Sequence, residues 1–285
     1  MRFRLLVLFA CTAALLRAGT PNEDAVALYK SKQYPDARAA FEKIAAAEPG
    51  NAEAHYYLGT LAEKRGDTDE AVKQLETATT LAPKNSTYFL ELGGAYSAAI
   101  DKAGILSQMS LAKKCQDALE KAVQLDPDNL LARNGLVSYY RQAPTFVGGG
   151  LSKAYEQAAE IKKRDPVMGA DVYGSLYVKE KKYDDAFAEF EHLLQTHPDN
   201  YVALYSIGRT AAQSGLKLDR GEQALRRCLE LTPGKNEPGP AAVQWRLGNI
   251  EEKRGAKEAA RLDYITALKV DPDFKSAADS LAKLK

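Results

Sequence analysis

The sequence predicts an all-α fold, a superhelical solenoid of about seven helix-turn-helix units that ends in a capping helix. Seven prolines recur along the 285 residues at spacings of 34, 44, 39, 32, 35 and 39, a period near 34 with insertions. Between the prolines, small and apolar residues return at helical spacing. No window shows sustained alternation of apolar and polar residues, so we expect no strands. This period indicates a stacked array rather than separate globular domains.

The composition is that of an ordinary soluble chain. Hydrophobic residues make up 45% and charged residues 27%, with 12 Pro and 20 Gly, which excludes a disordered or collagen-like protein. The 39 Lys and Arg stand against 38 Asp and Glu, for a net charge of +1. Since no excess of positive charge is available to neutralise phosphates, we do not expect a nucleic acid partner.

The first 18 residues have the pattern of a secretory signal peptide. Arg2 and Arg4 give a basic start, residues 5–16 form an apolar stretch of twelve, and Ala18 provides a cleavage site. We therefore expect residues 1–18 to be removed and the protein to be exported, either to the periplasm or out of the cell. Two alternatives are an uncleaved anchor, although about 20 residues are needed to cross a bilayer core, and a lipid anchor at Cys11. After processing we expect no integral membrane span.

Three positions in each unit form one helical stripe, counted back from the proline. The prolines are Pro49, Pro83, Pro127, Pro166, Pro198, Pro233 and Pro272. Twelve residues earlier stand Ala37, Ala71, Cys115, Ala154, Ala186, Gly221 and Ala260. Eight residues earlier stand Phe41, Leu75, Leu119, Ala158, Phe190, Leu225 and Tyr264, and five earlier Ile44, Ala78, Ala122, Ile161, Leu193, Cys228 and Ala267. Because the offsets differ by four and three residues, the stripe lies on one face of a helix.

Another helix precedes this one in each unit, and a glycine marks where the two helices approach closely. The marked positions are Leu58-Gly59, Leu92-Gly93, Tyr173-Gly174, Ile207-Gly208 and Leu247-Gly248. Turns at residues 126–129, 197–200 and 271–273 stop one helix at a proline and offer Asp or Asn to cap the next. These signals together predict a helix pair in every unit.

These residues resemble the tetratricopeptide repeat, a 34-residue helix-turn-helix unit with the pattern W-x2-L-G-x2-Y, then A-x3-F, then P. Residues 52–85 are the cleanest copy, with Leu58, Gly59, Ala71, Leu75, Ala78 and Pro83. On this resemblance we place the array at residues 19–272. Residues 273–285 carry an apolar stripe and predict the terminal capping helix that a stacked array needs for solubility.

Insertions break the period at three places. The third unit has ten extra residues near residues 97–110, which we expect to lengthen both of its helices. The fourth unit has five extra residues at 143–150, where Ala-Pro and Gly-Gly-Gly require the chain to turn. Five more lie at residues 234–240. The long third unit and the 143–150 loop are similar to a group of exported bacterial repeat proteins without assigned activity.

The sequence offers no catalytic or metal site, so we predict that the protein is not an enzyme and uses no cofactor. Residues 148–153 lack the order of a phosphate-binding loop and follow no expected strand. His192 and His197 are five apart, whereas a spacing of four would align two metal ligands on one helix face. No G-x-S-x-G elbow supports a serine nucleophile. Cys115 and Cys228 fall on stripe positions, and we expect them to be small buried residues rather than a disulfide.

The resemblance implies a scaffold for protein-protein interaction, in which the first helix of each unit lines a concave groove for an extended peptide or a partner helix. By the family's register, the groove also includes Thr60, Ser138, Asp171, Asn249 and Glu252. The candidates for peptide binding are Tyr56, Asn134, Arg141, Tyr205, Arg209 and Trp245. All of them except Tyr56 fall between units four and seven, where the aromatic and arginine side chains favour an acidic peptide. Trp245 has a competing role in the core, because it stands one place from the family's tryptophan.

The family's best-known ligand mode, a clamp on a C-terminal carboxylate, does not fit this sequence. The matching places hold Asn22, Val26, Glu53, Tyr56, Tyr57 and Glu91, a set that lacks the clamp's pattern of two lysines, two asparagines and an arginine. Two other functions stay open. The protein could be a subunit of an envelope assembly complex that binds through its loops or convex face, or an accessory factor of an enzyme.

Overall fold

The computed structural model describes residues 20–284, in which the chain forms fifteen α-helices, one short 3-10 helix and no strand. The first fourteen α-helices form seven consecutive pairs, so the predicted all-α array of about seven helix pairs is confirmed. The predicted signal peptide, residues 1–18, lies outside the described residues. The helices are α1 (Pro21–Lys30), α2 (Tyr34–Ala47), α3 (Ala52–Lys64), α4 (Thr68–Leu81), α5 (Ser86–Ile100), α6 (Ile105–Leu125), α7 (Leu130–Gln142), η1 (Thr145–Val147), α8 (Leu151–Arg164), α9 (Pro166–Lys179), α10 (Tyr183–Thr196), α11 (Tyr201–Ser214), α12 (Leu218–Glu230), α13 (Pro240–Arg254), α14 (Lys257–Val270) and α15 (Lys275–Lys283).

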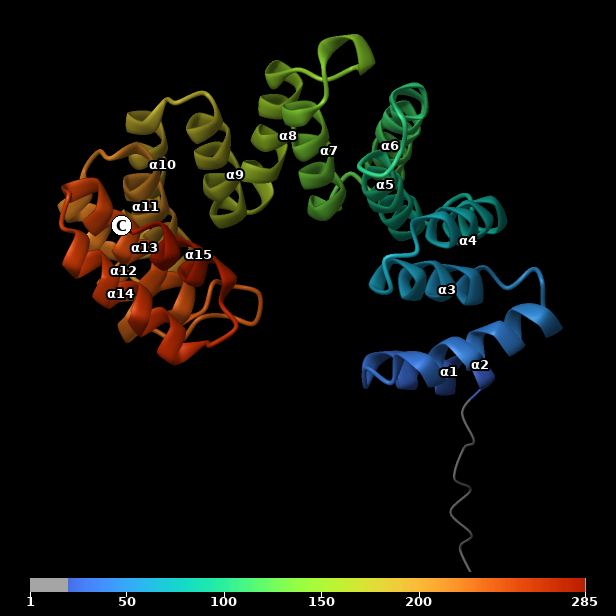
Figure 1. Ribbon diagram of the computed structural model, residues 1–285. Helices are drawn as coiled ribbons and strands as arrows, with labels where there is room; N and C mark the ends of the chain where they lie inside the picture. Colours follow the sequence, from blue (N-terminus) through green and yellow to red (C-terminus); the bar gives the residue numbers. More distant parts are fainter. Residues whose placement is uncertain (1–19, 285) are drawn as a thin grey trace, which may run out of the picture.

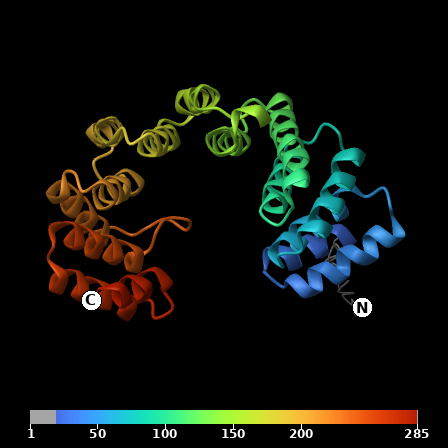
Figure 2. The same cartoon turned by 45° about the horizontal axis from the view of Figure 1, so that its top comes forward.

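The pairs follow one another along an arch (Figure 1), and its two ends face each other across an opening (Figure 2). The first helices of neighbouring units pack on one another from α3 through α13. The second helices pack mainly on the first helices beside them. Because the first helices are the more closely spaced set, the array curves toward them, and they line its concave face.

Every residue of the predicted stripe is buried. The close approach of paired helices is also confirmed, since a Cβ on Gly59 would lie only 2.6 Å from Leu75 Cγ. In the fourth unit the sizes are reversed. There the first helix carries the larger Val137 at the position that glycine holds in most other units. The second helix carries the small Ala158 at the stripe position that faces it. Each unit thus fills a similar space with one large and one small side chain.

Two of the three predicted Asp or Asn caps are present. The side chains of Asn129 and Asn200 accept a backbone N–H from the first turn of α7 and of α11, at 3.0 and 2.9 Å. The expected cap at Asp273 is wrong, because α15 begins after Phe274 and has no side-chain cap. The carboxylate of Asp271 instead accepts the N–H of Asp273 at 3.1 Å and fixes the turn that precedes the helix.

The insertions in units three and four reshape one end of their helix pairs. Helix α6 has 21 residues against 14 in α4, and α5 has 15 against 13 in α3, so both helices of the third unit are longer than those of the second. In the fourth unit, residues 143–150 form a turn that contains η1 and ends with Gly148 in a left-handed conformation and Gly150 at a φ of 147°. The elongated helices of unit three therefore stand beside this enlarged turn.

The final helix, α15, covers the end of the array as predicted. Its Ala277 is fully buried, and Leu284 just beyond it packs in a small core with Tyr264. The indole of Trp245 donates a hydrogen bond to Ser280 Oγ at 2.9 Å, and its ring meets that of Phe274 edge-on at 5.9 Å. Trp245 therefore contributes to the packing of the cap, the role that competed with ligand binding.

Candidate functional site

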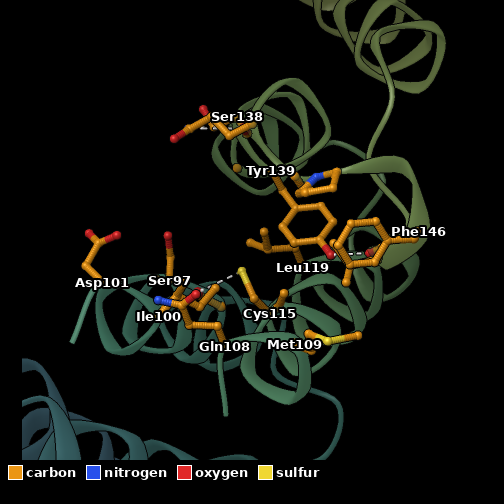
Figure 3. A pocket seen from close by; sticks show the side chains of 18 of the residues that line it. Ser97, Ile100, Asp101, Gln108, Met109, Cys115, Leu119, Ser138, Tyr139 and Phe146 are labelled. Carbon is orange, nitrogen blue, oxygen red and sulfur yellow. Dashed lines mark hydrogen bonds between the residues drawn. The ribbon is translucent and has the colours of Figure 1, made fainter. Parts of the chain in front are cut away.

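An apolar pocket of about 470 Å³ lies between α5, α6, α7 and the 143–150 loop, and we name it the apolar pocket. Small residues of α5 and α7 line it and leave space between the helices, among them Gly94, Ser97 and Ser138. Leu119 of α6 forms the floor. Its side chain packs closely against α5, because a Cβ added to Gly93 would lie only 2.7 Å from it. Figure 3 shows Leu119 at the floor with Ser97 and Ser138 on different walls.

Exposed apolar side chains stand at the rim of this pocket. Ile105 is 80% exposed, Met109 48% and Phe146 73%. They are three of the eight large hydrophobic residues found exposed where the structure describes side-chain burial, although the pocket occupies a small part of the surface. Isolated exposed apolar residues need no explanation, but a group of them around an apolar cavity is typical of a binding site.

Hydrogen bonds hold the 143–150 loop as a fixed wall. The hydroxyl of Tyr139 donates to Val147 O at 2.5 Å. The backbone N–H of Gly149 donates to Pro144 O at 3.1 Å, and that of Gly150 donates to Tyr140 O at 2.8 Å. Because these bonds satisfy the loop's own backbone groups, the wall presents its side chains, Phe146 among them, without rearrangement.

The chemistry of the apolar pocket suits binding rather than catalysis. Its one thiol, Cys115, is 2% exposed and donates to Gly93 O at 3.3 Å. Burial raises the pKa of the Cys115 thiol to about 11, so the group is neutral near pH 7 and is a poor nucleophile. Cys228 is equally buried, and burial raises its pKa to about 12. Both cysteines thus have the packing role that the sequence predicts.

A second, polar pocket of about 380 Å³ lies on the concave face, where α1, α3 and α5 meet. We name it the tyrosine-glutamate pocket, and it is lined by Tyr29, Tyr56, Thr60, Glu63, Lys64 and Glu91. The ring of Tyr56 stacks on Tyr88 with centroids 4.6 Å apart, which ties α3 to α5. The ammonium of Lys64 lies over the ring of Tyr29, 5.7 Å from its centroid. The pocket thus combines aromatic faces with charges of both signs.

Burial perturbs both carboxylates of this pocket, and the charge of Glu91 adds to the shift at Glu63. Burial, followed by the charge of Glu91, raises the pKa of Glu63 to about 7, and Lys64 opposes the shift. Burial likewise raises the pKa of Glu91 above its ordinary value. Burial and the charge of Glu91 also raise the pKa of the Tyr56 hydroxyl. These shifts indicate that two carboxylates share a partly desolvated space without adequate compensation by a cation.

The two pockets are neighbours across α5. Leu90 lines the apolar pocket and Glu91 the tyrosine-glutamate pocket. Gly94 is in the wall of the apolar pocket. A Cβ added to it would lie 3.9 Å from Oε1 of Glu63, which lines the tyrosine-glutamate pocket. A segment bound in the concave groove can therefore contact both.

The six residues predicted to bind peptide do not converge on one pocket. Tyr56 lines the tyrosine-glutamate pocket, while Asn134 and Arg141 are half-buried on α7 on either side of Ser138, which lines the apolar pocket. Tyr205 is only 8% exposed. Arg209 lies 3.6 Å from the carboxylate of Asp171, and Trp245 packs under α15 as described above. Ligand binding between units four and seven stays a prediction.

Sequence reasoning missed the apolar residues of the rim and floor. They stand outside the register of groove positions, on the second helix α6 and in the loop after α7. The signal that could have found them was the location of the insertions, because residues 97–110 and 143–150 supply two walls of the pocket. Within residues 20–284, no group of three or more His, Cys, Asp or Glu side chains is arranged to hold a metal ion. No helix among the described residues is long and apolar enough to cross a bilayer.

Comparison with known proteins supports the repeat assignment. A family model for the tetratricopeptide repeat matches residues 23–86. The CTR9 homolog of Arabidopsis thaliana is 29% identical over 135 residues, which is 46% of this chain. Cellulose synthase operon protein C of Pseudomonas fluorescens is 24% identical over 157 residues, or 52% of this chain. The matched segments span only 11% and 12% of those two relatives.

Solved structures share the fold over most of the chain. A tetratricopeptide repeat protein of Parabacteroides merdae superposes with a TM-score of 0.67 at 17% identity, covering 93% of this chain and 96% of that one. The C-terminal part of a Cytophaga hutchinsonii repeat protein gives a TM-score of 0.56 at 21% identity, covering 91% and 99%. The human IFIT1 dimer with m7Gppp-AAAA gives 0.60 at 18% identity, covering 93% and 62%. Together with the family model, these likenesses show that the chain carries tetratricopeptide repeats at residues 23–86 and has the solenoid fold of tetratricopeptide repeat proteins.

Proposed function

We propose that this protein is a non-catalytic scaffold that holds a polypeptide partner in its concave groove and anchors it in the apolar pocket. The observation that carries the proposal is the cavity of about 470 Å³ with Ile105, Met109 and Phe146 exposed at its rim. Stacked helical repeats present such concave surfaces to protein partners. Burying the exposed rim and filling the floor would supply the hydrophobic contribution that dominates association.

The dimensions of the pocket suit the apolar side chains of a partner. Its volume falls in the lower part of the range of roughly 300 to 1,000 Å³ found for binding sites. The lining includes residues of the first helices α5 and α7, so a partner's backbone could run along these helices while one or two side chains enter the pocket. Well-packed anchors of this kind carry most of the energy of many protein interfaces.

A pocket-filling substitution tests this proposal. Ser97 is exposed and lines the pocket, so Ser97→Trp should occupy the cavity without disturbing the core. Ala98→Trp is the matched control, because Ala98 is exposed on the same helix but does not line the pocket. With a photo-reactive phenylalanine analogue in place of Phe146 in the native host, we expect a polypeptide adduct that Ser97→Trp reduces at least about tenfold and Ala98→Trp leaves intact.

The outcome also separates this function from the assembly-subunit alternative. Phe146 is 73% exposed in the 143–150 loop, which favours a contribution of the loop to binding. If Phe146→Ser abolishes co-purification of the cross-linked polypeptide with the protein and Ser97→Trp does not, the loop alone binds the partner and the groove is incidental. If neither substitution changes co-purification of that polypeptide with the protein, the apolar pocket is not the binding site.

Export is part of the proposal and is supported by the basic, apolar and small-residue pattern of residues 1–18. We expect the protein purified from its native host to begin at residue 19 or close to it. N-terminal sequencing measures this directly. A chain that still began at Met1 would contradict cleavage and would favour the uncleaved anchor.

A further inference from the structure

We infer that the concave groove selects a partner segment that carries a basic side chain beside an apolar one, with the basic group in the tyrosine-glutamate pocket. This inference rests on the proposed function, because it names the chemistry of the segment whose apolar side chain enters the apolar pocket. The occupant is a polypeptide that contains lysine or arginine. The identification comes from charge complementarity and from the adjacency of the two pockets.

The aromatic part of the tyrosine-glutamate pocket is suited to a cation. The ammonium of Lys64 already lies 5.7 Å from the ring centroid of Tyr29 and 5.3 Å from that of Tyr34. The ring of Tyr56 is held by stacking on Tyr88, so its position does not depend on a ligand. Tyrosine faces attract ammonium and guanidinium groups through the quadrupole of the ring.

The carboxylates of the pocket lack a partner of their own. Among residues 20–284, neither Glu63 nor Glu91 forms an ion pair or a side-chain hydrogen bond, although both are half-buried. Lys64 is the only cationic residue that lines the pocket, and its ammonium faces the tyrosine rings. When both glutamates are ionised, two negative charges therefore face one positive charge. A guest cation would supply the missing partner, and partial desolvation would strengthen the interaction.

Because the two pockets are adjacent, they determine which kind of residue accompanies the basic one in the partner segment. Leu90 and Glu91 are consecutive on α5 and line different pockets, and the wall residue Gly94 lies against Glu63. A partner side chain in the tyrosine-glutamate pocket therefore places its neighbours on the same helical face over the apolar pocket. An apolar segment without a basic residue would leave the two glutamates partly desolvated and unpaired.

Short synthetic peptides test this inference. We would use the full chain and fluorescein-labelled, alanine-rich peptides that carry one leucine and, on the same helical face, a lysine, an alanine or a glutamate. The lysine peptide should bind about tenfold more tightly than the alanine peptide, and the glutamate peptide most weakly. The double variant Glu63→Gln, Glu91→Gln should remove this preference, whereas Lys64→Gln should increase it.

A control variant makes the same change in net charge at two positions outside the groove. Glu230→Gln with Glu258→Gln alters two glutamates whose side chains are 64% and 87% exposed on α12 and α14, and it should leave the lysine preference unchanged. Circular dichroism checks that helicity is retained in every variant. A lysine preference that survives the Glu63→Gln, Glu91→Gln change would overturn the inference.

Failure of the inference can be distinguished from failure of the proposed function. If all three peptides bind equally and Ser97→Trp abolishes binding, the apolar pocket is the anchor and the basic specificity is refuted. If no peptide binds at measurable concentrations, or if Ser97→Trp has no effect on those that do, the proposed function itself is refuted.

A pH series gives a second readout of the same site. Glu63 faces Tyr29 from α1, Tyr56 and Lys64 on its own helix, and Glu91 from α5. Since the pKa of Glu63 is raised to about 7, the carboxyl is neutral below that pH and charged above it. The lysine preference should therefore weaken as the pH falls from about 8 to about 6, while the alanine peptide changes little. A lysine preference that does not change with pH would exclude Glu63 from the interaction.

Discussion

Leu75→Ala is expected to lower the free energy of unfolding by about 2 to 5 kcal/mol, the cost of removing a large side chain from a packed core. Leu75 is fully buried and packs directly beneath Gly59 of the facing helix. Because Gly59 has no side chain, it cannot fill the cavity that the Leu75→Ala change would leave between the two closely packed helices. Thermal or denaturant unfolding of the variant and the unaltered protein measures the difference.

The effect should be concentrated around unit two. Helices α3 and α4 pack on α2 and α5, so weakening this unit loosens the connection between unit one and the rest of the array. We expect faster hydrogen exchange in α1 to α4 than in α11 to α14. Leu262→Ala is the matched control, because Leu262 is 66% exposed on α14 and its truncation should cost little. Similar destabilisation by the two changes would contradict the assigned helix packing.

The helix pairs could be predicted from the sequence because each unit repeats the same local information. Stripe residues such as Phe41 and Phe190 recur at a fixed distance from a proline, and their burial follows from that spacing alone. The cap at Asp273 could not be predicted as reliably. Which residue caps α15 depends on where the turn after Val270 places the chain, and there Asp271 accepts the N–H of Asp273 before the helix begins.

The pockets were less accessible to sequence reasoning. The insertions near residues 97–110 and 143–150 were evident, but their meeting at one cavity depends on how unit three stacks on unit four. A register of groove positions also cannot tell which residues the fold covers. Trp245 is placed under α15, and Tyr205 is 8% exposed because it belongs to the core cluster that neighbouring units form within residues 170–250. Tyr56 lies in a pocket because two neighbouring first helices leave space there.

The second large effect is expected from Gly149→Ala, which should cost about 3 kcal/mol and abolish binding at the apolar pocket. A Cβ at this position would lie 1.8 Å from the backbone oxygen of Ala143. Since the obstructing atom belongs to the backbone, the 143–150 loop must move as a whole. Movement would break the hydrogen bond from the Gly150 N–H to Tyr140 O and displace Phe146 from the rim.

Three measurements distinguish this local rearrangement from general unfolding. Helicity should be retained, hydrogen exchange of the Gly150 amide should accelerate, and binding of the leucine peptides should be lost. Gly50→Ala is the control, because a Cβ at Gly50 meets nothing within 4 Å. If Gly149→Ala accelerates exchange in the loop and peptide binding persists, the wall formed by the loop is not needed and the groove side of the pocket suffices. If binding is lost while the Gly150 amide remains protected, the loop did not move, and the link drawn between its conformation and the apolar pocket is wrong.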